Sequence, residues 1–138
     1  WEPLVETLDN RLGSDCVKTL AIRSEHRPER AWRYIRPGAE PQKPSPVQPT
    51  EHRSIQALAP RPFWLLPHPR PLHCRQGQPV YHGALILESG PERIESGWWD
   101  GGDIARDYYR ARNRQGQKLW VFRERRGERS WYLHGIFA

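Results

Sequence analysis

The sequence contains no methionine, only two cysteines and no long apolar run. No stretch approaches the 18 apolar residues of a membrane span, and the N-terminus lacks a signal-peptide pattern, so we predict no membrane segment. Cys16 and Cys74 lie too far apart in the sequence to suggest a disulfide framework, which favours a reducing cytosol. Because the chain begins with Trp1 and has no methionine, we expect a fragment of a longer protein.

Proline is abundant and unevenly placed, with 12 of the 14 prolines between Pro28 and Pro79. Because proline cannot donate a backbone hydrogen bond, we expect neither long helices nor central strands in this stretch. Residues 37–60 combine many prolines with few large apolar side chains, which predicts a semi-extended linker. The linker separates residues 1–36 from a C-terminal domain at residues 61–138.

The first 36 residues predict a helix followed by a strand. Leu4, Leu8 and Leu12 recur at helical spacing and Gly13 suits a helix end, so the helix is expected over residues 1–13. A short strand is expected at residues 17–22, and an extended basic arm with Trp32 at residues 26–33. A helix and a strand are too little to bury a core, so we interpret residues 1–36 as the tail of a preceding domain.

Short apolar runs separated by turn residues follow residue 61. They predict strands at residues 63–66, 84–87, 93–99, 107–112, 119–122 and 131–137, with turns at 89–92, 115–116 and 126–128. Residues 63–66 are boxed by prolines, as in an edge strand, whereas residues 119–122 are apolar on both faces, as in a covered central strand. We predict a mainly β fold, a small antiparallel meander that is curled or barrel-like.

Side chains that could support catalysis are present but poorly arranged. The possible metal ligands are His68, His73, Cys74 and His82, whose spacing does not match a zinc site. The carboxylates Glu92, Glu95, Asp100, Asp103 and Asp107 alternate with arginines, which favours ion pairs over acid–base or Mg²⁺ chemistry. With no phosphate-binding glycine loop either, we predict a non-enzyme that uses no metal and no cofactor.

Tryptophan, tyrosine and arginine are concentrated in the predicted sheet of this basic chain, whose formal net charge is +6. The adjacent Trp98 and Trp99, beside turn residues, predict a fixed bend that either buries or presents two large rings. The candidate partner-binding residues are Trp98, Trp99, Asp100, Tyr108, Trp131 and Phe137. The candidate residues for single-stranded DNA are Arg110, Arg112, Arg123, Arg125, Arg126 and Trp120. In a third interpretation most of the rings fill the core and the arginines form the solvated surface. The residues alone do not choose between partner binding, DNA binding and core packing.

Several segments together resemble a known family. They are HRPERAW (26–32), RPFWLLPHPRPL (61–72), SGPERIESGWWDGGDIARDYYRA (89–111), LWVFRE (119–124) and WYLHGIFA (131–138). This order is similar to the C-terminal part of ImuB proteins, bacterial relatives of the Y-family translesion DNA polymerases. The resemblance implies a polymerase-like architecture without catalytic carboxylates, located in the cytoplasm with the nucleoid. It also implies a hub role in damage-induced (SOS) mutagenesis.

The partners that the resemblance implies are a sliding clamp, an ImuA-type RecA-related protein and an error-prone DnaE-class polymerase. Residues 1–36 would then be the tail of the little-finger-like domain, and residues 61–138 an appended docking domain. The family's clamp-binding peptide resembles QLPLWG, whereas residues 56–60 read QALAP and lack the aromatic anchor, so clamp binding is expected outside this chain. We expect a non-catalytic docking domain. A single-stranded DNA-binding module is the alternative, and an exposed edge at residues 63–66 or in the C-terminal strand is a further candidate for pairing with a partner strand.

Overall fold

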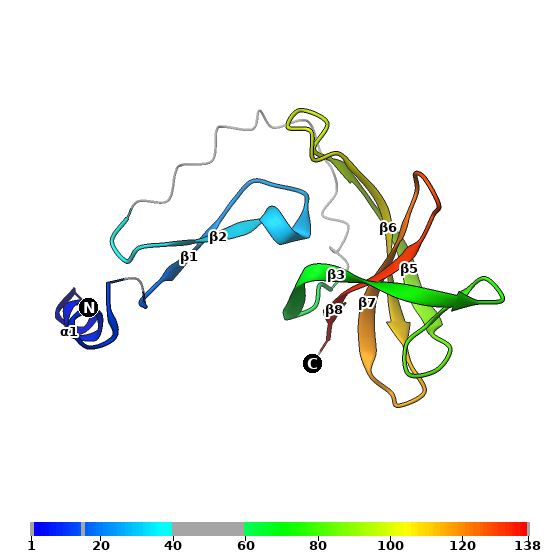
Figure 1. Ribbon diagram of the computed structural model, residues 1–138, viewed down its shortest axis with the longest axis horizontal. Helices are drawn as coiled ribbons and strands as arrows, with labels where there is room; N and C mark the ends of the chain where they lie inside the picture. The colour runs from blue at the N-terminus through cyan, green and yellow to red at the C-terminus, as the bar shows by residue number, and fades with distance from the viewer. Residues whose placement is uncertain (1, 15, 40–59, 138) are drawn as a thin grey trace. The chain divides into compact units, whose positions relative to one another are not determined.

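The computed structural model describes residues 2–14, 16–39 and 60–137. The backbone contacts divide the chain into two compact units, residues 1–53 and residues 54–138. Figure 1 shows the elements of each unit. Most of the predicted linker at residues 37–60, including the QALA of the string at residues 56–60, lies outside the described residues.

The first unit contains α1 (Glu2–Leu12), β1 (Thr19–Ile22), the 3₁₀ turn η1 (Pro28–Arg30) and β2 (Trp32–Ile35). The helix stops as predicted, because Gly13 takes a φ of 98° and its N–H donates to the carbonyl of Asp9 at 2.9 Å. The prediction of an extended arm at residues 26–33 is wrong. This segment contains η1 and then turns into β2, which pairs antiparallel with β1 and sets Trp32 opposite Ile22.

The second unit is a six-stranded antiparallel sheet that curls like part of a barrel (Figure 1). Its strands are β3 (Trp64–Arg75), β4 (Gln78–Val80), β5 (Ile86–Ser96), β6 (Ile104–Arg112), β7 (Lys118–Glu124) and β8 (Trp131–Ile136). The spatial order is β4-β3-β8-β7-β6-β5, so β5 to β8 form a meander and β3 joins at its far side. The predicted mainly β, curled architecture is confirmed. The C-terminal strand β8 lies between β3 and β7, so it is no edge on which a partner strand could pair.

The predicted turn at residues 89–92 is wrong, because β5 continues through it as one strand. Its pairing with β6 shifts register between Leu87 and Ser89 and again between Ser89 and Glu92, so the segment is a bulge. Gly90 has a φ of 123°, and a Cβ there would lie 2.6 Å from the carbonyl oxygen of Tyr108. Only glycine tolerates both conditions, and the chain bends here without reversing.

Strand β3 runs through the proline-rich stretch, with β8 along one edge, and includes Pro67, Pro69 and Pro71. Pro67 and Pro69 lie in the irregular stretch between Leu65 and Arg70, where no register pair with β8 is formed, and Pro71 follows it opposite Tyr132. The prolines therefore lie on a part of β3 whose outer edge is open, as expected for residues that cannot donate a backbone hydrogen bond. In the described part of the chain that outer edge is paired only at residues 73–75, by β4.

Strand β7 carries the core, since its four apolar residues are almost completely buried. Leu119 and Val121 pack into one cluster on one face of the sheet, while Trp120 and Phe122 pack into a second cluster on the other. The first cluster also contains Leu85, Ala111, Trp131 and Leu133, and the second contains Ile94 and Tyr108. The predicted covered central strand is therefore confirmed.

Leu133 provides a test of this core because its side chain is 1% exposed within the first cluster. Replacing it with alanine removes buried methyl groups and leaves a cavity, so we expect Leu133→Ala to lower the free energy of unfolding by about 2–5 kcal/mol. Urea unfolding followed by tryptophan fluorescence measures the loss. Leu87→Ala is the control, since Leu87 is 42% exposed and should lose far less; equal losses would contradict the assigned core.

Candidate functional site

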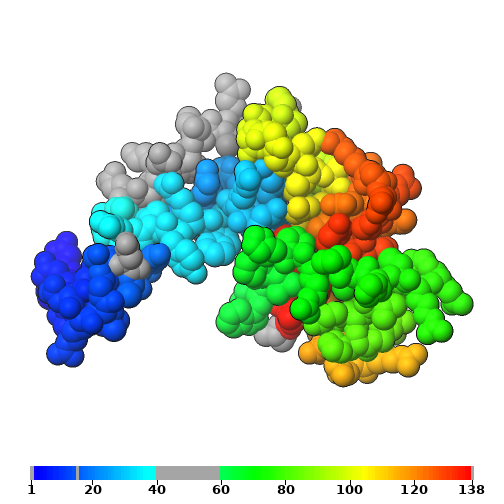
Figure 2. Space-filling model, in the orientation of Figure 1, coloured from blue at the N-terminus to red at the C-terminus, as the bar shows by residue number. Residues whose placement is uncertain are grey.

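The connection between β5 and β6 presents two tryptophans at the surface. Trp98 is 80% exposed and Trp99 is 57% exposed. Their rings meet edge to face, with centroids 5.5 Å apart and an interplanar angle of 85°. In Figure 2 the segment around residue 100, drawn in yellow, stands at the surface of its unit. The bend is confirmed, and it exposes both rings.

The backbone of this turn is held by two short-range hydrogen bonds. The N–H of Asp100 donates to the carbonyl of Gly97 at 3.3 Å, and the N–H of Gly102 donates to Oδ1 of Asp100 at 3.0 Å. Gly97 and Gly101 have φ values of 90° and 71°, which glycine adopts without the steric cost of a Cβ. These bonds hold the backbone that carries the two indole rings. The Asp100 side chain contributes by accepting the Gly102 N–H.

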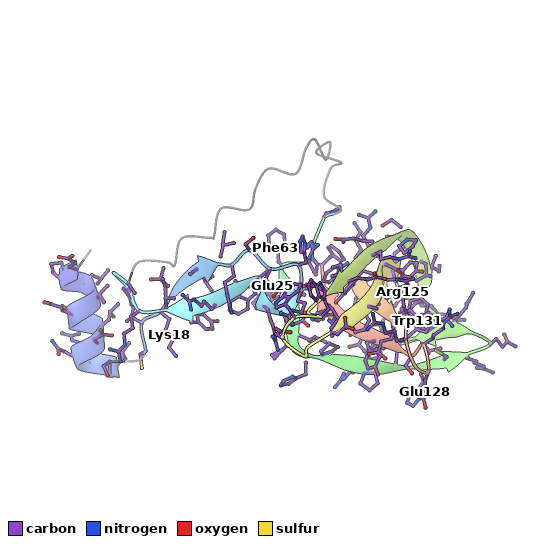
Figure 3. All side chains as sticks on the ribbon, turned by 90° about the horizontal axis from the view of Figure 1, so that it is seen from above. Lys18, Glu25, Phe63, Arg125, Glu128 and Trp131 are labelled. Atoms are coloured by element: carbon purple, nitrogen blue, oxygen red, sulfur yellow. The ribbon has the colours of Figure 1, made fainter. Side chains whose placement is uncertain are left out.

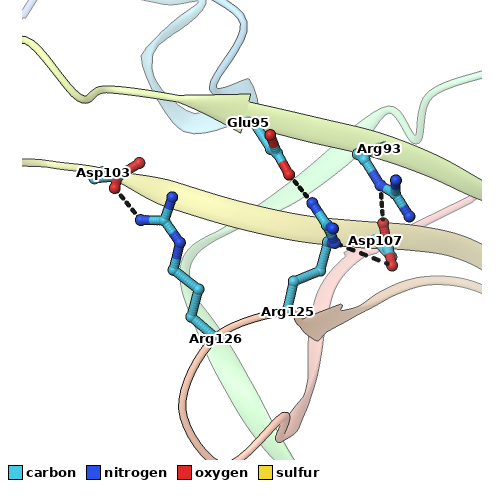
Figure 4. A network of polar contacts seen from close by, with 6 residues as sticks. All are labelled: Arg93, Glu95, Asp103, Asp107, Arg125 and Arg126. Atoms are coloured by element: carbon cyan, nitrogen blue, oxygen red, sulfur yellow. Dashed lines mark hydrogen bonds and ion pairs between the residues drawn. The ribbon is translucent and has the colours of Figure 1, made fainter.

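An ion-pair network lies at the base of the turn (Figure 4). Arg93 donates from Nε to Oδ1 of Asp107 at 2.9 Å, across strands β5 and β6. Arg125 pairs with Glu95 and lies 3.8 Å from the other Asp107 oxygen. The hydrogen bond with Asp107, followed by its negative charge, raises the pKa of Arg93, which keeps the guanidinium charged. The predicted cross-strand ion pairs are thus present.

This network joins both sides of the tryptophan turn to the β7–β8 connection. Glu95 precedes the turn and binds Arg125, while Asp103 follows it and binds Arg126. Both arginines belong to the β7–β8 connection at residues 125–130. A single exposed ion pair contributes about 0–1 kcal/mol, so the network matters more for fixing position than for stability.

Three of the candidate aromatic residues lie inside the sheet's two core clusters. Tyr108, Trp120 and Trp131 are 1%, 3% and 6% exposed. Tyr108 stacks on Trp120 with centroids 4.0 Å apart, and its hydroxyl forms a 2.7 Å hydrogen bond with Nδ1 of the buried His134. Packing therefore accounts for these rings. Phe137 is half-buried beside the second cluster, which leaves Trp98, Trp99 and Asp100 as the exposed members of the predicted partner-binding set.

Four of the five arginines proposed for DNA binding form ion pairs within the sheet. Arg112 lies 2.8 Å from a Glu88 oxygen, and Arg110 lies 3.8 Å from the other. Arg125 and Arg126 belong to the network of Figure 4. Arg123 differs, because its Nε donates to a backbone carbonyl, that of Arg129, at 3.1 Å. The ring intended for base stacking, Trp120, is buried, so these six residues do not form one stacking surface.

The possible metal ligands of the sequence do not converge. They are His68, His73, Cys74 and His82, and among the described residues no three His, Cys, Asp or Glu side chains form a group that could hold a metal ion. No helix in the described ranges is long and apolar enough to cross a membrane.

Two further features of the surface lie outside the two candidate residue sets. Phe63 and Trp64, in the segment expected to form an exposed edge, are 87% and 71% exposed just before and at the start of β3. Arg129 has a positive φ of 54° in the β7–β8 connection, two residues before Trp131 in the sequence. Figure 3 shows Arg125, Glu128 and Trp131 gathered at this end of the sheet, and Phe63 apart from them. No local pattern predicted the conformation of Arg129, because it depends on how strands β7 and β8 are connected.

The chain matches known proteins in sequence. The chain is 32% identical to Protein ImuB of Caulobacter vibrioides strain NA1000 / CB15N over 159 aligned residues, which cover 99% of the chain. The chain is homologous to part of ImuB. The same values hold for Protein ImuB of strain ATCC 19089. The alignment covers 33% of these relatives, so the chain spans about a third of their length, which is consistent with the C-terminal part that the motifs resemble.

No protein-family model matches the chain. No solved structure matches it either.

The hydrogen bond between Tyr108 and His134 can be tested by removing one hydroxyl. Tyr108→Phe keeps the stacked ring but deletes this buried hydrogen bond and the one that the hydroxyl accepts from Arg106 at 3.2 Å, so we expect a loss of about 1–3 kcal/mol of stability, measured by thermal or urea unfolding. Tyr109→Phe is the matched control, because the Tyr109 hydroxyl forms no hydrogen bond in the described part of the chain. A Tyr108→Phe protein as stable as the control would contradict the role given to this bond.

Proposed function

We propose that residues 61–138 are a non-catalytic protein-docking domain of an ImuB-type protein that acts in damage-induced mutagenesis. The observation that carries the proposal is the pair of exposed tryptophans held on a glycine-bounded turn. The homology to ImuB supports the mutagenesis context, and the curled sheet supplies the rigid base.

Exposed tryptophans are suited to docking because of their size. Tryptophan is enriched among the few interface residues that contribute most of the binding energy, together with tyrosine and arginine. A large ring left in water gains free energy when a partner pocket covers it. Trp98 is the stronger anchor, since it offers the larger exposed fraction of its side chain.

The fixed backbone adds to this argument. A loop that must become ordered on binding loses conformational entropy, which weakens the affinity. Here Asp100 bonds within the turn, and the carboxylates of Glu95 and Asp103 tie its two sides to the β7–β8 connection. The turn is therefore already close to one conformation, so less of the interaction energy is lost in ordering it.

The partner is taken from the family resemblance. An ImuA-type RecA-related protein, an error-prone DnaE-class polymerase, or both would cover the tryptophan turn, while a sliding clamp would bind outside this chain. Strand pairing at residues 63–66 is a weaker route, because the prolines that follow leave few N–H donors on the outer edge of β3.

Substitution of the tryptophans tests the proposal. Trp98→Ala and Trp99→Ala should each weaken binding of the ImuA-type protein at least tenfold in isothermal titration, since a docking anchor contributes about 2 kcal/mol or more. Because both rings are exposed, the free energy of unfolding should change by no more than about 0.5 kcal/mol.

Trp64→Ala is the matched control, because Trp64 is 71% exposed but lies on β3, away from the turn in the sequence. It should leave the affinity unchanged. Unaltered binding by both turn variants would reject this turn as the anchor, and a turn variant that unfolds would show that the rings stabilise the sheet instead. The same titration with the DnaE-class polymerase distinguishes the two proposed partners.

A further inference from the structure

A second surface lies between the β3–β4 and β7–β8 connections. It is an open pocket of about 420 Å³ whose lining includes Arg123, Arg129, His73, Ser130 and Trp131. The strand register explains why these residues meet: Trp131 lies opposite Arg123 on one side and opposite Leu72 on the other. Trp131 is 6% exposed, so it forms the floor of the pocket. The rim is polar and basic and includes Arg123, Arg129 and Ser130.

Arg123 is held in place over this floor. Its Nε donates to the carbonyl of Arg129 at 3.1 Å, and its guanidinium carbon lies 5.9 Å from the centre of the Trp131 ring. Among the described residues its terminal N–H groups have no acceptor. Asp107 lies opposite Arg123 in the register, but its oxygens pair with Arg93 and Arg125. The side chain is thus positioned while its strongest donors stay available.

Arg129 completes the basic rim. Its backbone φ of 54° is unusual for a residue with a side chain, and such conformations often occur at functional sites. Within the described residues Arg129 has no carboxylate partner, and Glu128, the acidic residue of the lining, forms no ion pair with either arginine. The contrast is with Arg93, Arg110, Arg112, Arg125 and Arg126, which all have carboxylate partners.

We propose that this pocket binds a phosphate group of a nucleic-acid backbone. Guanidinium groups present planar pairs of donors that match the oxygens of a phosphate. Residues 54–138 contain 13 Arg or Lys and 8 Asp or Glu, a formal charge of +5 that attracts a polyanion. Arg70 lies outside the lining, two residues before Leu72 on β3 and opposite Leu133, and it too has no carboxylate partner in the described part of the chain.

Two arginines in one pocket lining favour a polyanion over a single acidic side chain, because one carboxylate needs only one guanidinium partner. Because the Trp131 ring is buried, the pocket offers no surface for stacking a base. Binding would then depend on phosphates and not on base identity, and it would weaken steeply as salt concentration rises. This inference is independent of the docking proposal, since it uses neither tryptophan of the β5–β6 turn.

The test is fluorescence anisotropy of a labelled oligothymidine with the full 138-residue chain across a salt series. Arg123→Gln and Arg129→Gln should each weaken binding at least about fivefold at 100 mM salt. Each should also reduce the slope of log K against log salt concentration by about 0.7, the value for one lost phosphate contact on a single strand. Arg129→Gln is expected to stay folded, because the Arg129 side chain forms no hydrogen bond or ion pair in the described structure. Weaker binding by this variant would therefore not be caused by unfolding.

Arg112→Gln is the matched control, with the same loss of charge at an arginine that Glu88 already neutralises. It should leave both affinity and slope close to those of the unaltered chain. Equal weakening by all three variants would mean that overall charge, and not the pocket, binds DNA. Binding of a polyglutamate peptide that is lost in Arg123→Gln, with no oligothymidine binding, would assign the pocket to a carboxylate and overturn the proposal.

Discussion

Burial of strand β7 on both faces is the constraint on which the sheet depends. Its residues alternate between two clusters, so each face must be covered by side chains from β6 and β8. That requirement sets the register of the meander and brings Tyr108, Trp120 and His134 into one buried stack. The aromatic content of the sheet is therefore divided: rings on β6, β7 and β8 pack into the two clusters, whereas Trp98 and Trp99 on the β5–β6 turn lie outside them.

The same register organises the charges at one end of the sheet. The row from Arg93 through Asp107 to Arg123 alternates in sign across three strands, and one aspartate cannot neutralise every arginine around it. Asp107 pairs with Arg93 and Arg125, which leaves Arg123 directed toward Arg129 and Trp131. The end of the sheet thus carries two distinct surfaces, the turn with the exposed Trp98 and Trp99 and the basic pocket beside Trp131.

Much of the sheet could be predicted because the signals were local. The apolar run at residues 119–122 and the Gly-containing turn at residues 115–116 each specify their structure within a few residues. The errors came where pairing overrides local preference. Gly90 and Pro91 look like a turn, yet strand β6 pairs on both sides of them. Two of the prolines of β3 are accommodated where its pairing with β8 is interrupted, between Leu65 and Arg70.

The sequence by itself determined that two tryptophans would share a glycine-bounded bend, that residues 119–122 would be covered on both faces, and that the chain resembles ImuB. Only the tertiary structure decided which rings face water and which arginines lack a carboxylate. Exposure and ion pairing depend on residues brought together from different strands, as Arg123, Trp131 and Leu72 are. Spacing along the chain fixes a residue's face within its own strand, but not the neighbour that the register places beside it.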